Sequence, residues 1–209
     1  MARYTDANCK LCRRERQKLF LKGTKCFSSK CPVEKRNYPP GQHGQNRRIK
    51  ISEHGIQLRE KQKVRRMYGL TEKQFHIYYV KSSRLKGKTG ENLIKMLESR
   101  LDNVIYRMGL APSRKAARQM ILHKHFTVNG RAVNVPSYLL RGGDVVQVVN
   151  RSKKLDVIHD SMKRVRDNAM YPWLSLDKAT LQGTFLQVPE REEVQLQASE
   201  QLIVEFYSK

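Results

Sequence analysis

The chain has 209 residues, which allows one large domain or two modest ones with a hydrophobic core. It carries 42 Lys and Arg against 19 Asp and Glu, a formal net charge of +23 that far exceeds what solubility requires. Such a chain repels itself unless a polyanion neutralises it, and nucleic-acid phosphates suit that role. No apolar stretch approaches the roughly 18–20 residues that cross a bilayer, and no signal-peptide pattern opens the chain. We therefore expect a cytoplasmic chain without a membrane partner.

The positive charge is concentrated in the first three quarters of the chain. Basic residues outnumber acidic ones by 11 in 1–50, by 7 in 51–100 and by 5 in 101–150, whereas 151–209 contains 9 of each. A single basic run is most simply a solvated face, but a gradient over 150 residues is harder to explain that way. We expect the first three quarters to face the polyanion and the last quarter to pack or to meet protein neighbours.

Four cysteines, the only ones in the chain, lie within a loop-rich basic region, 1–48. Cys9, Cys12, Cys26 and Cys31 follow the spacing Cys-x2-Cys-x13-Cys-x4-Cys. Two close pairs joined by a loop can place four thiolates at the corners of a tetrahedron, as in structural zinc sites. Two disulfides or four free thiols are the alternatives, and the lack of a signal peptide and the clustering of the thiols disfavour them. We expect one structural Zn2+ ion that staples this region.

A stiff loop follows the cysteines. In Tyr38-Pro39-Pro40-Gly41-Gln42-His43-Gly44 the prolines favour an extended backbone and the glycines allow close approach to a partner. A simple surface turn is the alternative. Because Arg47, Arg48 and Lys50 come next, we expect this loop to lie along phosphates.

Two helices are predicted after this loop. The first, 53–68, has a thin apolar stripe, carries cations on its other faces and ends at Gly69. The second, 71–84, starts with a capping box formed by Thr71 and Gln74. A basic, glycine-containing hinge follows it and is the expected domain boundary.

Residues 91–108 have an apolar stripe at helical spacing, which predicts a core helix. Ser113 is predicted to cap a second, shorter helix. Arg114, Lys115 and Arg118 then lie together near the positive end of that helix. Three cations at a helix N-terminus form a phosphate clamp.

The segment His123-Lys124-His125 leads into a predicted hairpin. Asn129-Gly130 between alternating apolar residues indicates a type I′ turn, and we expect another strand over 145–149 and a helix over 152–166. The histidines could be metal ligands, but no further ligand lies at suitable spacing. A basic hairpin shoulder, with Arg131, is therefore expected to touch RNA.

The last part, 169–209, contains Trp173 and ends in the apolar run Gln201-Leu202-Ile203-Val204-Glu205-Phe206-Tyr207. An apolar terminus needs cover, so we expect this part to fold back onto the helices of 49–90. The expected fold class is α+β. A mainly helical domain is built from N- and C-terminal parts, and the inserted module, 91–168, contains helices and a small antiparallel sheet.

Several motifs carry a resemblance to a known family. Three stretches resemble an RNA-binding module that also occurs in some pseudouridine synthases and tyrosyl-tRNA synthetases. They are Ser99-Arg100-Leu101-Asp102-Asn103, Ser113-Arg114-Lys115-Ala116-Ala117-Arg118 and Val128-Asn129-Gly130. Three other stretches are more specific to one family. They are Arg3-Tyr4 with the cysteines, the Tyr38 to Gly44 loop, and Glu200-Gln201-Leu202-Ile203-Val204-Glu205-Phe206-Tyr207-Ser208. Over nearly its full length the sequence resembles the family of the fourth protein of the bacterial small ribosomal subunit, in its four-cysteine branch.

The resemblance implies a structural protein of the ribosome that binds a junction of helices in small-subunit ribosomal RNA early in assembly and contributes to translational accuracy. It implies neighbouring ribosomal proteins and mRNA near the entry region as further partners, and no small-molecule substrate. Pattern and resemblance together predict these RNA-binding residues: Arg3, Arg13, Arg14, Arg36, Tyr38, His43, Arg47, Arg48, Lys50, Arg59, Lys61, Lys63, Arg65, Arg66, Arg114, Lys115, Arg118, His123, Lys124, His125, Asn129 and Arg131.

Two other functions would share some of these features. An RNA-modifying enzyme could use the same module, but the sequence contains no Gly-rich phosphate loop, nucleophile elbow or recognisable catalytic Asp motif. A zinc-dependent DNA-binding regulator would tie a recognition helix directly to its metal site, whereas Pro39 and Pro40 separate the cysteines from the first basic helix. We therefore expect an RNA-binding protein that is not an enzyme.

Overall fold

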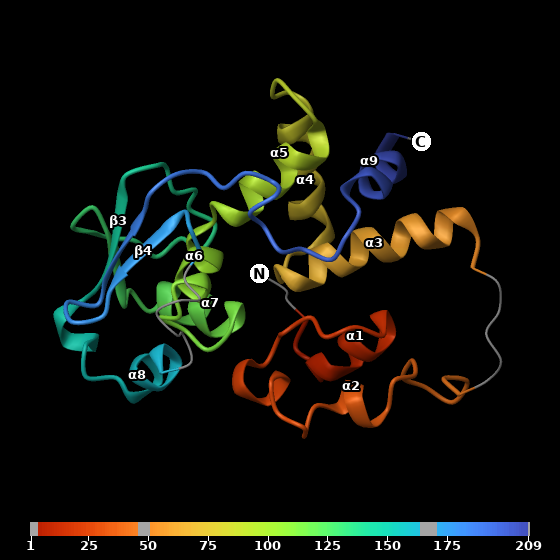
Figure 1. Cartoon of the computed structure of the whole chain (residues 1–209), viewed down its shortest axis with the longest axis horizontal. Coiled ribbons are helices and arrows are strands. Elements are labelled where there is room, and N and C mark those ends of the chain that lie inside the picture. Colours follow the sequence, from red (N-terminus) through yellow and green to blue (C-terminus); the bar gives the residue numbers. More distant parts are fainter. Residues whose placement is uncertain (1–3, 46–50, 164–170, 209) are drawn as a thin grey trace. The chain divides into compact units, whose positions relative to one another are not determined.

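The computed structural model describes residues 4–45, 51–163 and 171–208. Over these residues the chain has the expected α+β composition (Figure 1). The helices are α1 (Asn8–Glu15), α2 (Pro32–Lys35), α3 (Glu53–Met67), α4 (Glu72–Ser83), α5 (Thr89–Glu98), α6 (Leu101–Arg107), α7 (Arg114–Leu122), α8 (Asp156–Met162) and α9 (Glu200–Ser208). The strands are β1 (Phe126–Val128), β2 (Arg131–Ala132), β3 (Asp144–Val148), β4 (Leu174–Asp177) and β5 (Gln182–Phe185). None of the described helices is long and apolar enough to cross a membrane.

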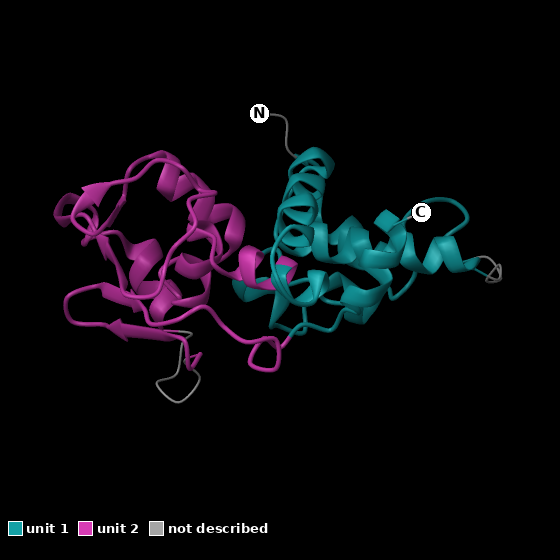
Figure 2. Cartoon of the chain, turned by 90° about the horizontal axis from the view of Figure 1, so that it is seen from above, with its two compact units in different colours: residues 1–92, 196–209 teal, residues 93–195 magenta. Residues whose placement is uncertain are grey.

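The chain divides into two compact units, coloured separately in Figure 2. Unit 1 consists of Met1–Asn92 with Leu196–Lys209, and unit 2 is Leu93–Gln195. A unit assembled from both ends of the chain encloses an insertion, as the sequence suggests. The expected C-terminal part, 169–209, differs from this division, because β4 and β5 belong to the sheet of unit 2 and only the last residues return to unit 1.

Local signals place α3 and α4 as predicted. The Ser52 hydroxyl caps α3 by accepting from the Gly55 N–H at 3.2 Å, and the chain leaves the helix through Gly69 at φ 64°. The Thr71 hydroxyl caps α4 by accepting from the Gln74 N–H at 3.5 Å. The residues before α3 contain two shorter helices, α1 and α2, within the region that the sequence predicts to be loop-rich.

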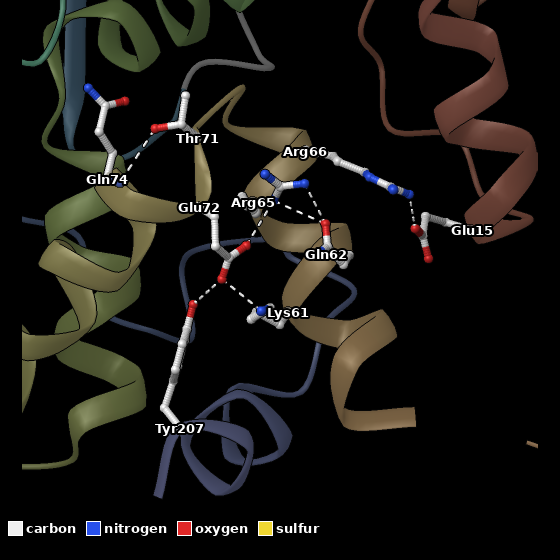
Figure 3. Close-up of polar contacts among 9 residues, drawn as sticks. All are labelled: Glu15, Lys61, Gln62, Arg65, Arg66, Thr71, Glu72, Gln74 and Tyr207. Carbon is white, nitrogen blue, oxygen red and sulfur yellow. Dashed lines mark hydrogen bonds and ion pairs between the residues drawn. The ribbon is translucent and has the colours of Figure 1, made fainter. Parts of the chain in front are cut away.

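The C-terminal helix α9 packs along α3, far from it in sequence (Figure 1). Gln57 donates to a Glu205 carboxylate oxygen at 3.1 Å. The Tyr207 hydroxyl donates to Glu72 Oε1 at 2.8 Å, and the ammonium of Lys61 contacts the same carboxylate at 2.7 Å (Figure 3). Burial and the Glu72 carboxylate raise the pKa of Tyr207, so its hydroxyl remains a donor at any physiological pH. The apolar end of the chain therefore obtains its cover from α3 and α4.

Tyr207→Phe is expected to destabilise unit 1 by about 1 kcal/mol, because the phenol loses one hydrogen bond to a partly exposed carboxylate. The ring remains, so its packing on Tyr79, with centroids 4.6 Å apart, persists. Urea unfolding of the full chain measures the change. Tyr138→Phe, a change at a 40 % exposed ring in unit 2, is the control and should be nearly neutral. Equal stability of the Tyr207→Phe variant and the unaltered chain would contradict a stabilising role for this bond.

The predicted single helix over 91–108 is wrong, since α5 and α6 are separated by an extended residue. Arg100 has φ −70° and ψ 138° and forms a β-bridge with Leu139. The Leu101 N–H donates to the Tyr138 carbonyl at 2.8 Å, so a later loop captures the backbone at the break. The apolar periodicity continues across the break and conceals it. The helix predicted over 152–166 is also shorter, and residues 164–166 lie outside the described part of the chain.

Within the described residues, unit 2 contains one antiparallel sheet with the strand order β2-β1-β3-β5-β4. Asn129 and Gly130, at φ 49° and 77°, form the predicted two-residue turn between β1 and β2. The sheet has more strands than expected because the last quarter supplies two of them. Phe126, Trp173 and Phe185 are fully buried in this unit.

Candidate nucleic-acid interface

Two arginines near the N-terminus of α7, Arg114 and Arg118, contact other side chains of unit 2. The Ser113 hydroxyl caps the helix, accepting from the Ala116 N–H at 3.2 Å. Arg114 Nε donates to Asn103 at 2.7 Å, and its guanidinium lies 4.6 Å from the centre of the Tyr106 ring. Arg118 lies 3.7 Å from an Asp102 oxygen. The predicted clamp thus has a cap and two braced arginines.

Beneath this helix terminus lies a buried polar network. Glu98, which is fully buried, accepts from Arg107 at 2.8 Å and from Asn103 at 2.7 Å. Asn103 in turn supports Arg114, so the orientation of a partly exposed guanidinium depends on a buried carboxylate. Pre-oriented cations lose less side-chain entropy when they meet phosphates.

Several exposed basic residues of unit 2 lie on this helix, directly after it or in the hairpin. Lys115, His123, Lys124 and Arg131 are all exposed. Lys124 adopts φ 59°, a left-handed conformation that turns the chain from α7 into β1. These side chains have the exposure that phosphate contact requires.

Two predicted RNA-binding residues of this shoulder have structural partners instead. Asn129 donates to Asp144 at 2.8 Å and accepts from the Val145 N–H at 2.9 Å, so its amide ties the hairpin turn to β3. His125 lies 2.8 Å from the Ser152 hydroxyl. Burial, with His123 and Arg151 nearby, lowers the pKa of His125 and favours the neutral ring. Neither side chain adds a cation to the surface at neutral pH.

The basic residues of α3 are largely committed to carboxylates of unit 1. Arg59 and Arg66 both contact Glu15, whose side chain is only 2 % exposed. Figure 3 shows the contact of Arg66. Burial raises the pKa of Glu15, and the two arginines act in the opposite direction. These arginines therefore join α3 to α1.

Lys61, Lys63 and Arg65 have similar internal roles. Lys61 is 5 % exposed, and its ammonium lies 4.1 Å from the Phe206 ring centre as well as on Glu72. Lys63 pairs with Glu60 at 2.5 Å, and Arg65 donates to Gln62 at 3.0 Å. The structure gives Lys61 a place in the core of unit 1, with distant partners that the sequence alone does not reveal.

In the N-terminal region, Arg13 supports the Tyr38 loop. Its Nε donates to the Tyr38 carbonyl at 3.0 Å, and its guanidinium lies 4.6 Å from the Tyr38 ring centre. A Cβ at Gly44 would lie 1.9 Å from the Pro39 carbonyl oxygen. The backbone at position 44 therefore lies so close to Pro39 that only glycine fits there.

The other predicted residues of this region fall into two groups. Arg14, Arg36 and His43 are exposed. The remaining ones lie outside the described residues: Arg3, Arg47, Arg48 and Lys50.

The four cysteines are free thiols in one neighbourhood of unit 1. Cys12, Cys26 and Cys31 are 5–7 % exposed, and Cys12 and Cys31 belong to a small apolar cluster with Leu19. Burial and the three other cysteines raise the pKa of Cys12 to about 11. No three described His, Cys, Asp or Glu side chains are gathered into a group able to hold a metal ion.

The donor set nevertheless has the chemistry of a zinc site. The Lys22 N–H donates to Cys26 Sγ at 3.3 Å, and a backbone group at Leu19 donates to Cys12. Such bonds stabilise thiolates. Four neighbouring thiolates, three of them buried, would repel one another, and a divalent cation would remove that repulsion. The residues therefore fit the ion by type and number.

Several exposed cations were missing from the predicted site. In unit 1 they include Lys81, Arg84, Lys86 and Lys88 around the end of α4. Unit 1 also has Lys22, Lys25 and Lys30 among the cysteines, and unit 2 has Arg141, Arg151 and Lys154. Lys88 pairs with Glu91 at 3.0 Å. The first group coincides with the basic hinge, and its density of lysine and arginine is a signal that we assigned to a domain boundary instead of to a binding surface.

Exposed cations around a capped helix with braced arginines are typical of a nucleic-acid-binding protein. The chain matches the model of the Ribosomal protein S4/S9 N-terminal domain over 3–98 and that of the S4 domain over 99–146. It is 57 % identical to small ribosomal subunit protein uS4 of Syntrophobacter fumaroxidans, 55 % to that of Thermodesulfovibrio yellowstonii and 53 % to that of Geobacter sulfurreducens. Each match covers all of both chains.

The chain therefore belongs to the family of small ribosomal subunit protein uS4. This membership confirms the family that the sequence resembles, whereas the zinc-binding four-cysteine branch stays a prediction. It also places the chain among ribosomal proteins and not among enzymes, so the RNA-modifying alternative is set aside.

Proposed function

We propose that this chain binds small-subunit ribosomal RNA directly and acts as a structural protein of that subunit. The carrying observation is the set of exposed cations around the capped α7, within the residues that match the S4 domain. A-form RNA hides its base edges in a deep, narrow groove, so fixed cations read phosphate positions and 2′-hydroxyls across a junction of helices. Early binding in assembly, a contribution to translational accuracy, and contacts to neighbouring proteins and mRNA depend on this anchoring and belong to the same proposal.

We also propose that Cys9, Cys12, Cys26 and Cys31 hold one structural Zn2+ ion. The burial of Cys12, Cys26 and Cys31, the common neighbourhood of the four thiols and the N–H groups directed at sulfur support this assignment. When bound, the ion neutralises the thiolates and cross-links the segments that carry them. The site would have no open position for catalysis, since four protein ligands complete the coordination shell.

Removing surface charge from unit 2 tests the RNA-binding proposal. The triple variant Lys115→Ala, Lys124→Ala and Arg131→Ala is expected to bind small-subunit ribosomal RNA more weakly. The slope of log affinity against log salt should fall by roughly one for each phosphate that the variant no longer neutralises. Titrations at several salt concentrations measure both quantities.

Lys178→Ala is the matched control, because it removes an exposed cation from the charge-balanced last quarter. Its salt slope should equal that of the unaltered chain. A triple variant with unchanged affinity and slope would show that unit 2 does not bind the RNA phosphates.

A further inference from the structure

An exposed pair of aromatic rings in unit 1 has no role in the basic surface described above. The rings of Phe20 and Phe27 are stacked, with centroids 5.0 Å apart and planes inclined by 30°. Phe20 is 37 % exposed and Phe27 is 62 % exposed. Exposed phenylalanine is costly in water, and two stacked rings form a continuous apolar face.

The neighbouring residues direct these rings outward. Leu19, just before Phe20, is fully buried, and Cys26, just before Phe27, is 7 % exposed. Phe20 itself adopts φ 52°, a left-handed conformation that is uncommon for a bulky side chain. Non-glycine residues in this conformation are strained and cluster at functional sites. The backbone is thus strained at Phe20, a residue whose ring is exposed at the surface.

The surroundings of the pair are exclusively basic in sequence. Residues 18–30 contain Lys18, Lys22, Lys25 and Lys30 and no Asp or Glu. Lys22, Lys25 and Lys30 are exposed, whereas Lys18 pairs with Glu34. Aromatic rings among cations are the combination that binds single-stranded nucleic acid, because the bases stack while the cations follow the backbone. A protein partner of the usual mixed composition would not favour such a one-sided charge.

We propose that the Phe20–Phe27 pair is a stacking platform for an unpaired RNA base, with Lys22 and Lys25 toward its phosphates. This inference rests on the proposed function and extends it. The exposed cations read the positions of phosphates in folded RNA, whereas the platform captures a nucleotide that is not paired. Stacking tolerates any base, since every base has a π-face.

Two probes separate this inference from the proposed function. One is small-subunit ribosomal RNA, and the other is a short single-stranded oligoadenylate with one 2-aminopurine, whose fluorescence falls when it stacks. Phe27→Ala is expected to weaken binding of the oligoadenylate roughly 5-fold to 150-fold and to abolish the quenching. Phe27→Tyr keeps a ring and should retain both properties. Phe27→Leu keeps apolar surface without a ring and should behave like Phe27→Ala.

Two controls accompany these variants. Ile77→Ala removes a 44 % exposed apolar side chain from α4 and should leave both probes unaffected. Circular dichroism verifies that the variants fold. Because Phe27 is 62 % exposed, its replacement should leave the fold intact. Unchanged quenching and affinity in Phe27→Ala and in the double variant Phe20→Ala, Phe27→Ala would overturn the platform and indicate a protein-facing surface. Failure of the unaltered chain to bind ribosomal RNA would instead overturn the proposed function. The titration with oligoadenylate would still test, by itself, whether Phe20 and Phe27 stack on a base.

Discussion

Chelation of zinc is expected to unfold the cysteine region of unit 1 and to leave unit 2 folded. Binding to a structural site contributes on the order of 10 kcal/mol near neutral pH, and that free energy is also folding free energy. The region has only a small apolar cluster of its own, in which four buried residues, Cys12, Leu19, Cys31 and Val33, are joined by Leu21 and Met67. Metal analysis should find one zinc per purified chain, and circular dichroism should record a decrease of helical signal with chelator.

Cys12→Ser should reproduce the effect of the chelator, because it removes one ligand. Ser29→Ala, at an exposed position of the same region, should keep the zinc and serves as the control. Zinc added back should restore the unaltered chain but not the Cys12→Ser variant. A purified chain without stoichiometric metal, and indifferent to chelators, would end the zinc proposal.

Asp102→Ala is expected to destabilise unit 2 by about 3–5 kcal/mol, the usual result of leaving one member of a buried ion pair without its partner. Arg100 is 1 % exposed and donates to both oxygens of Asp102, at 3.0 and 2.5 Å. The pair lies at the break between α5 and α6, where the backbone bridges to Leu139. Urea unfolding of the full chain, followed through Trp173 in unit 2, measures the destabilisation.

Replacing both partners distinguishes charge from packing. The double variant Arg100→Met, Asp102→Leu should be much more stable than Asp102→Ala, because no charge is left buried. Asp160→Ala, which removes a 70 % exposed carboxylate from α8, should change stability little. An Asp102→Ala variant within about 1 kcal/mol of the unaltered chain would disprove the importance of the pair.

The sequence predicts elements that depend on nearby residues. The caps at Thr71 and Ser113 and the Asn129-Gly130 turn act within three or four positions, and all appear in the structure. The break at Arg100 depends on a loop nearly forty residues later, and β4 and β5 depend on β3, so neither could be predicted from a local pattern.

The candidate site was predictable in type but only partly in detail. A surplus of cations identifies the kind of partner, yet it does not say which cations reach it. Arg59, Lys61 and Arg66 share the pattern of surface residues, but Glu15 and Glu72 hold them inside unit 1. Their partners lie 11–51 residues away, so only the folded structure separates structural cations from exposed ones.

The central claim is that fixed cations match the anionic contour of folded small-subunit ribosomal RNA. Competition binding of the full chain to that RNA, with duplex DNA of equal phosphate content as competitor, tests it most directly. The account predicts that the RNA is retained against excess DNA. Its affinity should fall about a thousandfold or more between about 50 and 200 mM salt if roughly six to ten phosphates are neutralised. Equal competition by the DNA, or an affinity indifferent to salt, would contradict it.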